Sequence, residues 1–296
     1  MNHNIKIGVN PICWTNDDLP QLGGHISLET CLSEAQQIGF AGIELGHRFP
    51  REASQLYPLL EQYQLALISG WYSGHLVARS VTEERTALQD QLALLKTMGC
   101  DVLIYAETSE CIHGQQHVAL SHRPEMMVTN WRHYGEKLSE LAKHVADAGL
   151  RLAVHHHMGT LIQTQGDIEM LVEHTTDDVG LVLDTGHLAY AKGDIQFVLD
   201  HLSHRIAHVH CKDVRIEVLQ QSLKQNLSFL DAVIAGVFTV PGDGPINFKA
   251  VIDKLKSINY TGWVVVEAEQ YSDSIPAAVY AKKGYDTLVA LIGERD

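Results

Sequence analysis

Histidine and carboxylate residues gather in four short motifs of this sequence. Residues 153–160 read AVHHHMGT, 181–187 read LVLDTGH, 208–213 read HVHCKD and 264–270 read VVVEAEQ. Imidazoles mixed with carboxylates, without paired thiolates, suit Mn²⁺, Co²⁺, Zn²⁺ or Fe²⁺ better than a structural zinc site built from cysteines. The motifs therefore predict a divalent metal in a catalytic site.

Each motif follows a short apolar run of the kind that forms a buried parallel strand. A single histidine at a strand end is more often a hydrogen-bonded supporting group than a ligand, and Asp184 could be a plain turn residue. The joint placement carries the prediction, because unrelated surface groups have no reason to occupy successive strand ends. Titratable groups lie at or just beyond the C-terminal ends of six predicted strands. They are Glu44, Glu107, His155 to His157, Asp184 with His187, His210 with Lys212 and Asp213, and Glu267 with Glu269.

The elements that must position these groups alternate along the chain. Eight predicted strands are bounded by Gly, Pro or Asp, at 5–10, 41–45, 65–69, 101–106, 151–155, 180–184, 206–210 and 262–267. Eight strand-helix units in 296 residues, with no linker between them, predict one (β/α)8 barrel domain over 1–296. An open doubly wound sheet is the alternative. In a barrel the strand ends converge, so the polar groups become one site.

Helices are predicted where apolar residues recur at intervals of three and four. A helix from Leu28 to Ile38 has Ser27 as its N-cap and Gly39 at its end. The longest predicted helix covers 124–148, with Met127 and Trp131 among its core residues. The other predicted helices cover 52–63, 82–98, 167–174, 195–202, 247–258 and 276–292.

Three long stretches, at 14–25, 108–123 and 213–245, read as irregular and follow strands one, four and seven. They lie on the face where barrel enzymes carry their active sites and are predicted lids. Period-two alternation turns His208 and His210 to one side of their strand and Cys211 to the helix layer. The glycines of 240–248 could cradle a phosphate, but loop shaping before a helix capped by Asn247 is the favoured interpretation.

The composition excludes several classes of protein. The chain has 22 Lys and Arg against 36 Asp and Glu, a net charge of −14, so a nucleic-acid partner is not expected. Five cysteines without a CxxC pair favour a reducing compartment, and the cytoplasm is the predicted location. The first residues lack an apolar signal core, and no apolar run is long enough for a bilayer, so no membrane partner is expected.

The motifs together resemble the xylose-isomerase-like barrel superfamily and, within it, the family of inosose dehydratases. The resemblance rests on NPICWTNDD near the first strand, FAGIELG at the second, SGWYSG after the third and the four motifs above. LDTGH and the strand-eight Glu are shared by the superfamily, while HHHMGT, WYSG and VEAEQ are more particular to the dehydratases. These pieces span nearly the whole chain.

By this resemblance, the metal ligands of the superfamily fall on His155, Asp184, His210 and Glu267. Relatives that isomerise or epimerise sugars usually carry Glu at the position of His155, so this chain lacks a carboxylate that they use as acid or base. The strand-five ligand stays open between His155 and His157. The resemblance also implies Co²⁺ or Mn²⁺ together with glutathione, for which the sequence itself gives no signal.

The implied activity is dehydration of 2-keto-myo-inositol to a trihydroxycyclohexane-1,2-dione in inositol catabolism. Removal of the proton beside the ketone gives an enediolate, whose negative charge a divalent cation can stabilise. We expect His157 or Glu269 to be the base, and Lys212 and Glu44 to orient hydroxyls or to protonate the leaving hydroxyl.

Trp71 and Tyr72 are predicted to wall the substrate pocket together with His187, although packing within the barrel is an equal alternative for the two aromatic residues. The rival activities are a sugar or keto-polyol isomerase or epimerase on the same barrel, a DNA-repair endonuclease and a polyol-binding protein without catalysis. The expected partner is a small keto-polyol, and a homo-oligomer is plausible in every case.

Overall fold

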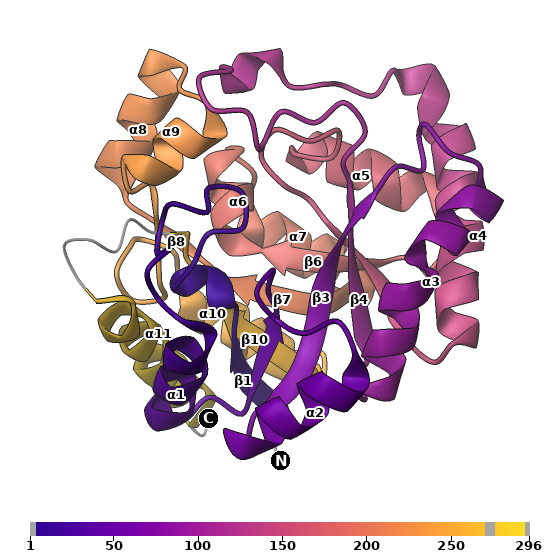
Figure 1. Cartoon of the computed structure of the whole chain (residues 1–296). Helices are drawn as coiled ribbons and strands as arrows, with labels where there is room; N and C mark the ends of the chain where they lie inside the picture. Colours follow the sequence, from indigo (N-terminus) through magenta and orange to yellow (C-terminus); the bar gives the residue numbers. More distant parts are fainter. Residues whose placement is uncertain (1–3, 270–275, 294–296) are drawn as a thin grey trace.

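The computed structural model describes residues 4–269 and 276–293, which form a closed barrel of eight parallel strands (Figure 1). Around the barrel the strands follow the order β1, β10, β7, β6, β5, β4, β3, β2. The predicted barrel is thereby confirmed and the open sheet is wrong. The barrel strands are β1 (Ile5–Val9), β2 (Gly42–Leu45), β3 (Ala66–Gly74), β4 (Val102–Glu107), β5 (Arg151–His155), β6 (Gly180–Asp184), β7 (Ile206–Cys211) and β10 (Gly262–Val266).

Side-chain alternation divides each strand between the barrel interior and the helix layer. Ile104, Ala153 and Val182 form an interior cluster, whereas Val209 and Cys211 belong to the large core between strands and helices. The predicted outward direction of Cys211 is confirmed, and burial raises the pKa of its thiol. Because every second residue faces inward, the last inward residue of a strand lies at the barrel mouth.

The helices lie outside the barrel, most of them between successive strands (Figure 1). The Ser27 hydroxyl accepts from Thr30 N, and Gly39 ends the first helix at a φ of 109°, as predicted. None of the described helices is long and apolar enough to cross a membrane. The helices are α1 (Leu28–Ile38), α2 (Ala53–Gln62), α3 (Val81–Thr97), α4 (Trp131–Asp147), α5 (Gln165–His174), α6 (Thr185–Tyr190), α7 (Ile195–His201), α8 (Ile216–Gln225), α9 (Phe229–Ile234), α10 (Phe248–Ser257) and α11 (Ala277–Gly293).

Helix α4 begins later than predicted. Residues 124–130 are irregular apart from a short 3-10 turn (Val128–Asn130), and Met127 has extended backbone angles. Met127 is 66% exposed, so its predicted place in the core is wrong. Its spacing to Trp131 fits a helical face by coincidence, because the regular hydrogen bonding starts only at Trp131.

The stretch 213–245 is not irregular, which corrects the prediction. It forms α8, α9 and a two-stranded antiparallel sheet of β8 (Asp213–Val214) and β9 (Phe238–Thr239), with Phe229 and Phe238 in its own core. The 108–123 loop contacts α9, because the side chains of Gln116 and His117 both bond the Asp231 carboxylate. In Figure 1, α8 and α9 stand together above the barrel at the upper left.

A substitution at Gly135 tests how closely α4 packs against α5. A Cβ at this position of α4 would overlap the carbonyl oxygen of His174 at the end of α5. We expect Gly135→Ala to destabilise the fold by about 1–3 kcal/mol despite the better helix propensity of Ala. At Gly166 in α5 the nearest atom would be Thr164 Oγ1 at 3.8 Å, so Gly166→Ala should leave stability unchanged or raise it. Urea unfolding of both variants measures the difference, and equal midpoints would contradict this packing.

Candidate active site

Four buried side chains from the ends of β5, β6, β7 and β10 converge at the barrel mouth. His155 Nε2 lies 3.1 Å from His210 Nδ1 and 3.5 Å from Asp184 Oδ2. His210 Nδ1 lies 2.9 Å from Glu267 Oε2 and 3.6 Å from Asp184 Oδ2. Ligands bound to one cation at about 2.0–2.2 Å lie about 3.0–3.5 Å from one another. The spacing of these four atoms is therefore that of a metal-ligand set.

The hydrogen bonds outside this cluster orient the two imidazoles. His155 Nδ1 lies 2.8 Å from the His156 carbonyl, and His210 Nε2 lies 3.2 Å from Glu44 Oε1. Since both partners are acceptors, the outer nitrogens carry the protons and the inner nitrogens can offer lone pairs to a cation. Outer partners of this kind are the usual support of metal-binding histidines.

The two carboxylate oxygens of Asp184 have different surroundings. Oδ1 accepts from His187 N at 2.8 Å and so caps α6, which explains the spacing of the LDTGH motif. Oδ2 faces the cluster and, although buried, has no hydrogen-bond partner among the described residues. A buried carboxylate oxygen without a donor is destabilising unless a cation lies beside it. The two imidazoles and two carboxylates thus fit a divalent cation, by geometry and by chemistry.

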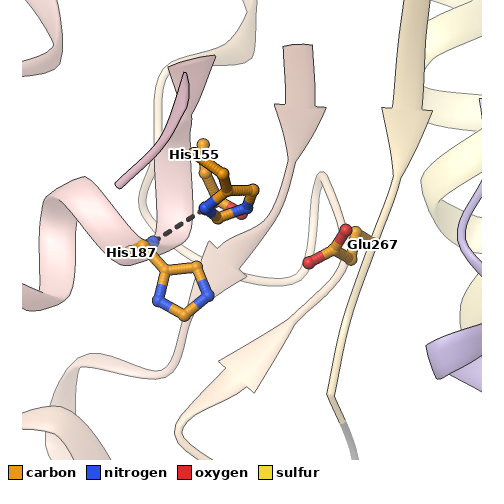
Figure 2. Close-up of side chains that lie close together, drawn as sticks. His155, His187 and Glu267 are labelled. Atoms are coloured by element: carbon orange, nitrogen blue, oxygen red, sulfur yellow. Dashed lines mark hydrogen bonds and ion pairs between the residues drawn. The ribbon is translucent and has the colours of Figure 1, made fainter. Parts of the chain in front are cut away.

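The His187 side chain lies next to the same cluster. One donor atom each from His155, Asp184, His187 and Glu267 lies within 4.8 Å of the other three. Figure 2 shows the His155 and His187 imidazoles and the Glu267 carboxylate facing one another across the barrel mouth. His187 is fully buried and is not among the residues that line the cavity, so its contact with substrate stays a prediction, and its position is that of an additional or alternative ligand.

Lys212 is buried behind the cluster. Its ammonium lies 2.6 Å from Glu267 Oε1, 2.8 Å from Glu269 Oε1 and 3.0 Å from His187 Nε2. Burial alone would lower the pKa of Lys212, but Asp184, Glu267 and Glu269 raise it well above its usual value. The side chain is not among the residues that line the cavity, and its predicted role toward substrate hydroxyls stays a prediction. Lys212 offsets the negative charge of the carboxylates.

Glu44 lines the cavity, but its carboxylate is surrounded by donors. Asn10 Nδ2 lies at 2.7 Å, Ser69 Oγ at 2.6 Å, His208 Nε2 at 2.8 Å and His210 Nε2 at 3.2 Å. A carboxylate that accepts at both oxygens has no proton to donate. These donors favour the ionised carboxylate, which orients His210, and the predicted role of Glu44 in orienting substrate hydroxyls stays a prediction.

The cavity above the cluster has a volume of about 270 Å³. Trp71 lines it, but Tyr72, the next residue in β3, packs in the core against Tyr105. The predicted substrate contact of Tyr72 is wrong, because neighbouring strand residues face opposite sides. The sequence-predicted residues that line the cavity are Glu44, Trp71, His155, His157, His210, Glu267 and Glu269.

His157 and Glu269 line the cavity, and each could take part in proton transfer. His157 Nδ1 donates to the Met158 carbonyl at 2.9 Å, and the ring packs 4.0 Å from that of His187. Burial, with the neighbouring His187 imidazole, holds the pKa of His157 well below its usual value, which favours the neutral imidazole. Glu269 Oε2 is buried without a partner among the described residues. Of the two strand-five candidates, His155 has the ligand geometry and His157 lines the cavity further out.

Two other sequence signals have structural roles. Glu107 at the end of β4 accepts from the backbone amides of Leu76 and Ser109, which anchors the loop after β3. In the 240–248 loop, the amides of Gly244 and Ile246 donate to the Asp213 carboxylate. The favoured interpretation of loop shaping is supported over a phosphate site, because these amides already have an anionic partner.

The cavity lining also includes residues that the sequence did not single out, among them Asn10, Asp17, Asp18 and His113. Asn10 follows β1 and bonds both Glu44 and Glu267, so it links two strand ends. The others lie in two of the predicted lid loops, where no periodicity reveals a side-chain direction.

The comparisons agree with this geometry. A family model described as xylose isomerase-like TIM barrel matches residues 32–291, and the chain therefore belongs to this family. The chain is 42% identical to the inosose dehydratase of Geobacillus thermodenitrificans, over 90% of this chain and 91% of that protein. It is 44% identical to the rhizopine catabolism protein MocC of Rhizobium meliloti, over 97% of this chain and 89% of that protein. The predicted resemblance to inosose dehydratases is confirmed.

Solved structures share the fold at low identity. The IOLI protein with a bound zinc atom has a TM-score of 0.69 at 17% identity, covering 97% of this chain and 98% of that one. A probable 3-DHS dehydratase, AsbF from Bacillus anthracis, has a TM-score of 0.69 at 15% identity, covering 98% and 100%. At this identity the likeness supports the barrel alone.

Glu267→Gln tests the ligand set, because it keeps the size of the side chain and removes one anionic donor. We expect the affinity for Mn²⁺ to fall by more than about 100-fold, beyond the effect of losing an outer partner. Titration calorimetry on metal-stripped protein measures the affinity. Glu107→Gln is the matched control, since the same change at a strand end outside the cluster should preserve binding. Equal affinities in the two variants would exclude Glu267 as a ligand.

Proposed function

We propose that this protein is a metal-dependent hydro-lyase that dehydrates 2-keto-myo-inositol to a trihydroxycyclohexane-1,2-dione. The main support is the buried group of His155, Asp184, His210 and Glu267 beneath a small polar cavity. Inosose dehydratases at about 40% identity over nearly the whole chain supply the substrate class. A compact cavity lined by carboxylates and imidazoles suits a small polyol.

His155, Asp184, His210 and Glu267 would hold the cation. When bound, it supplies Lewis-acid stabilisation of the negative charge that develops on substrate oxygens. The chain itself must remove the proton beside the ketone. The Glu269 carboxylate and the neutral His157 imidazole both line the cavity and are the two candidates for this base. Trp71 stands beside His157 at a ring distance of 5.4 Å and would limit the space for the ring of the substrate.

The donor set of two nitrogens and two oxygens favours a borderline cation, and we propose Mn²⁺ or Co²⁺ as the working metal. Zn²⁺ and Fe²⁺ are the alternatives. Glutathione enters the proposal only through the family resemblance, so the assay is run with and without it.

The rival function is an isomerase or epimerase on the same barrel. An L-ribulose 3-epimerase shares the fold at a TM-score of 0.68 but at only 16% identity. The presence of His155 where sugar-isomerising relatives usually carry Glu favours dehydration, because the exchange removes a carboxylate used for proton transfer in those relatives. Product analysis separates the two, since only a dehydratase releases water.

The metal requirement provides the direct test. Chelated protein should form no dione from 2-keto-myo-inositol, and Mn²⁺ or Co²⁺ should restore turnover, because developing charge on the substrate then has a counter-ion. Dione formation is followed by its ultraviolet absorbance and by mass loss of 18 Da. The substrate panel includes ketoses and a rhizopine, given the relative from Rhizobium meliloti. Turnover that is indifferent to chelation, or an isomeric product, would refute the proposal.

A further inference from the structure

Asp18 and His113 form a second polar group in the cavity, separate from the ligand cluster. Their side chains line the cavity, with His113 Nε2 3.6 Å from Asp18 Oδ1. Asp18 lies in the loop after β1, and His113 lies in the loop after β4. In the barrel order, β1 and β4 flank the ligand strands β10, β7, β6 and β5. The two loops therefore meet above the ligand cluster.

The pair is held in place and partly shielded from solvent. Asp18 N and Leu19 N donate to the Asn16 side chain, which fixes the loop after β1. The His113 ring packs 5.4 Å from His157 and 6.3 Å from Trp71. The exposed fractions of the His113 and Asp18 side chains are only 13% and 29%.

Both groups can exchange a proton. His113 Nδ1 is buried without a partner among the described residues, so the protein does not fix the tautomer of this ring. Burial raises the pKa of the Asp18 carboxyl, Glu269 adds to the rise, and His113 opposes it. The pair thus places two groups that can carry a proton beside each other at the cavity surface.

Dehydration needs a proton donor that the ligand cluster does not offer. Hydroxide is a poor leaving group, so the departing hydroxyl must receive a proton as its C–O bond breaks. The Glu44 carboxylate accepts from four donors. The Lys212 ammonium lies among carboxylates behind the cavity lining. The donor must therefore come from another part of the cavity wall, where His157 and Glu269 are the candidates for the base and Asp18 and His113 lie beside them.

We propose that the Asp18–His113 pair is the general acid that protonates the departing hydroxyl. The inference rests on the proposed dehydratase function. The base removes the proton beside the ketone, and the C–H electron pair forms the enediolate. The C–O bond then breaks, its electrons remain on oxygen, and that oxygen takes a proton from the pair and leaves as water. The enol product relaxes to the dione, and solvent returns a proton to the pair, so no oxidant or reductant is required.

The test separates the two half-steps in D₂O. In His113→Gln and Asp18→Asn, we expect dione formation to fall by about 10²- to 10⁴-fold, the usual contribution of a general acid. Exchange of the proton beside the ketone for deuterium, followed by NMR, should persist within about threefold of wild type. An enediolate that cannot lose hydroxide returns to the ketone and takes up deuterium.

A better leaving group gives an independent readout. A substrate analogue with fluoride in place of the departing hydroxyl needs no protonation, so both variants should release fluoride at rates close to wild type. His117→Gln is the matched control, because this exposed histidine of the same loop bonds Asp231 and does not line the cavity. It should leave dione formation unchanged. Thermal melts and Mn²⁺ affinity confirm that each variant keeps its fold and metal site.

Two outcomes would overturn the proposal. One is dione formation within about threefold of wild type in both variants. The other is loss of fluoride release in parallel with dione formation, which would make the pair a binding or base element. Failure of the proposed function itself is distinct, because wild type would then form no dione.

Discussion

The site depends on the crowding of buried acceptor atoms at the barrel mouth. Asp184 and Glu267 bring two carboxylates within reach of two imidazoles, in a region almost closed to water. Burying ionised groups is destabilising by several kcal/mol each, roughly, unless positive charge lies beside them. Lys212 provides one positive charge from behind. The remaining acceptor atoms lie close together, at a spacing that a divalent cation would fit.

The barrel fixes this arrangement through its sheet register. The candidate ligands lie at the ends of four adjacent strands, so the register sets their spacing. Asp184 pairs with His210 across the β6–β7 register, and Val265 pairs with His210 across β7–β10. The strands hold the candidate ligands, whereas the loops after β1 and β4 carry Asp18 and His113. This division is typical of the fold.

The sequence predicted those parts of the molecule that follow from local periodicity. Strands β5 and β6 begin and end at the predicted residues, because short apolar runs and a terminal polar group mark both ends. Tyr72 was predictable in the same way, since its neighbour Trp71 already occupied the inward face. Met127 was not, because only hydrogen bonding distinguishes a helix from an extended lead-in of similar spacing.

Tertiary contacts explain what the sequence could not predict. Helices α8 and α9 are short and their core is made with the 108–123 loop and α6, so no single segment displays it. Asp18 and His113 lie 95 positions apart in chain segments without a repeating pattern. Only the closure of the barrel, which brings the loops after β1 and β4 over the same strands, places them in contact.

The residue at the end of β5 links the ligand set to the loops. An imidazole adds no carboxylate to the cluster, so Asp184 and Glu267 lie beside His155 with the Lys212 ammonium close to both. A Glu at this position would add a third carboxylate. By the family resemblance, His at this position takes the place of a group that could carry protons. Proton transfer must then come from the cavity wall, where Glu269, His157 and the Asp18–His113 pair stand. The strands that carry the candidate ligands and the loops above them therefore supply different parts of the same proposed reaction.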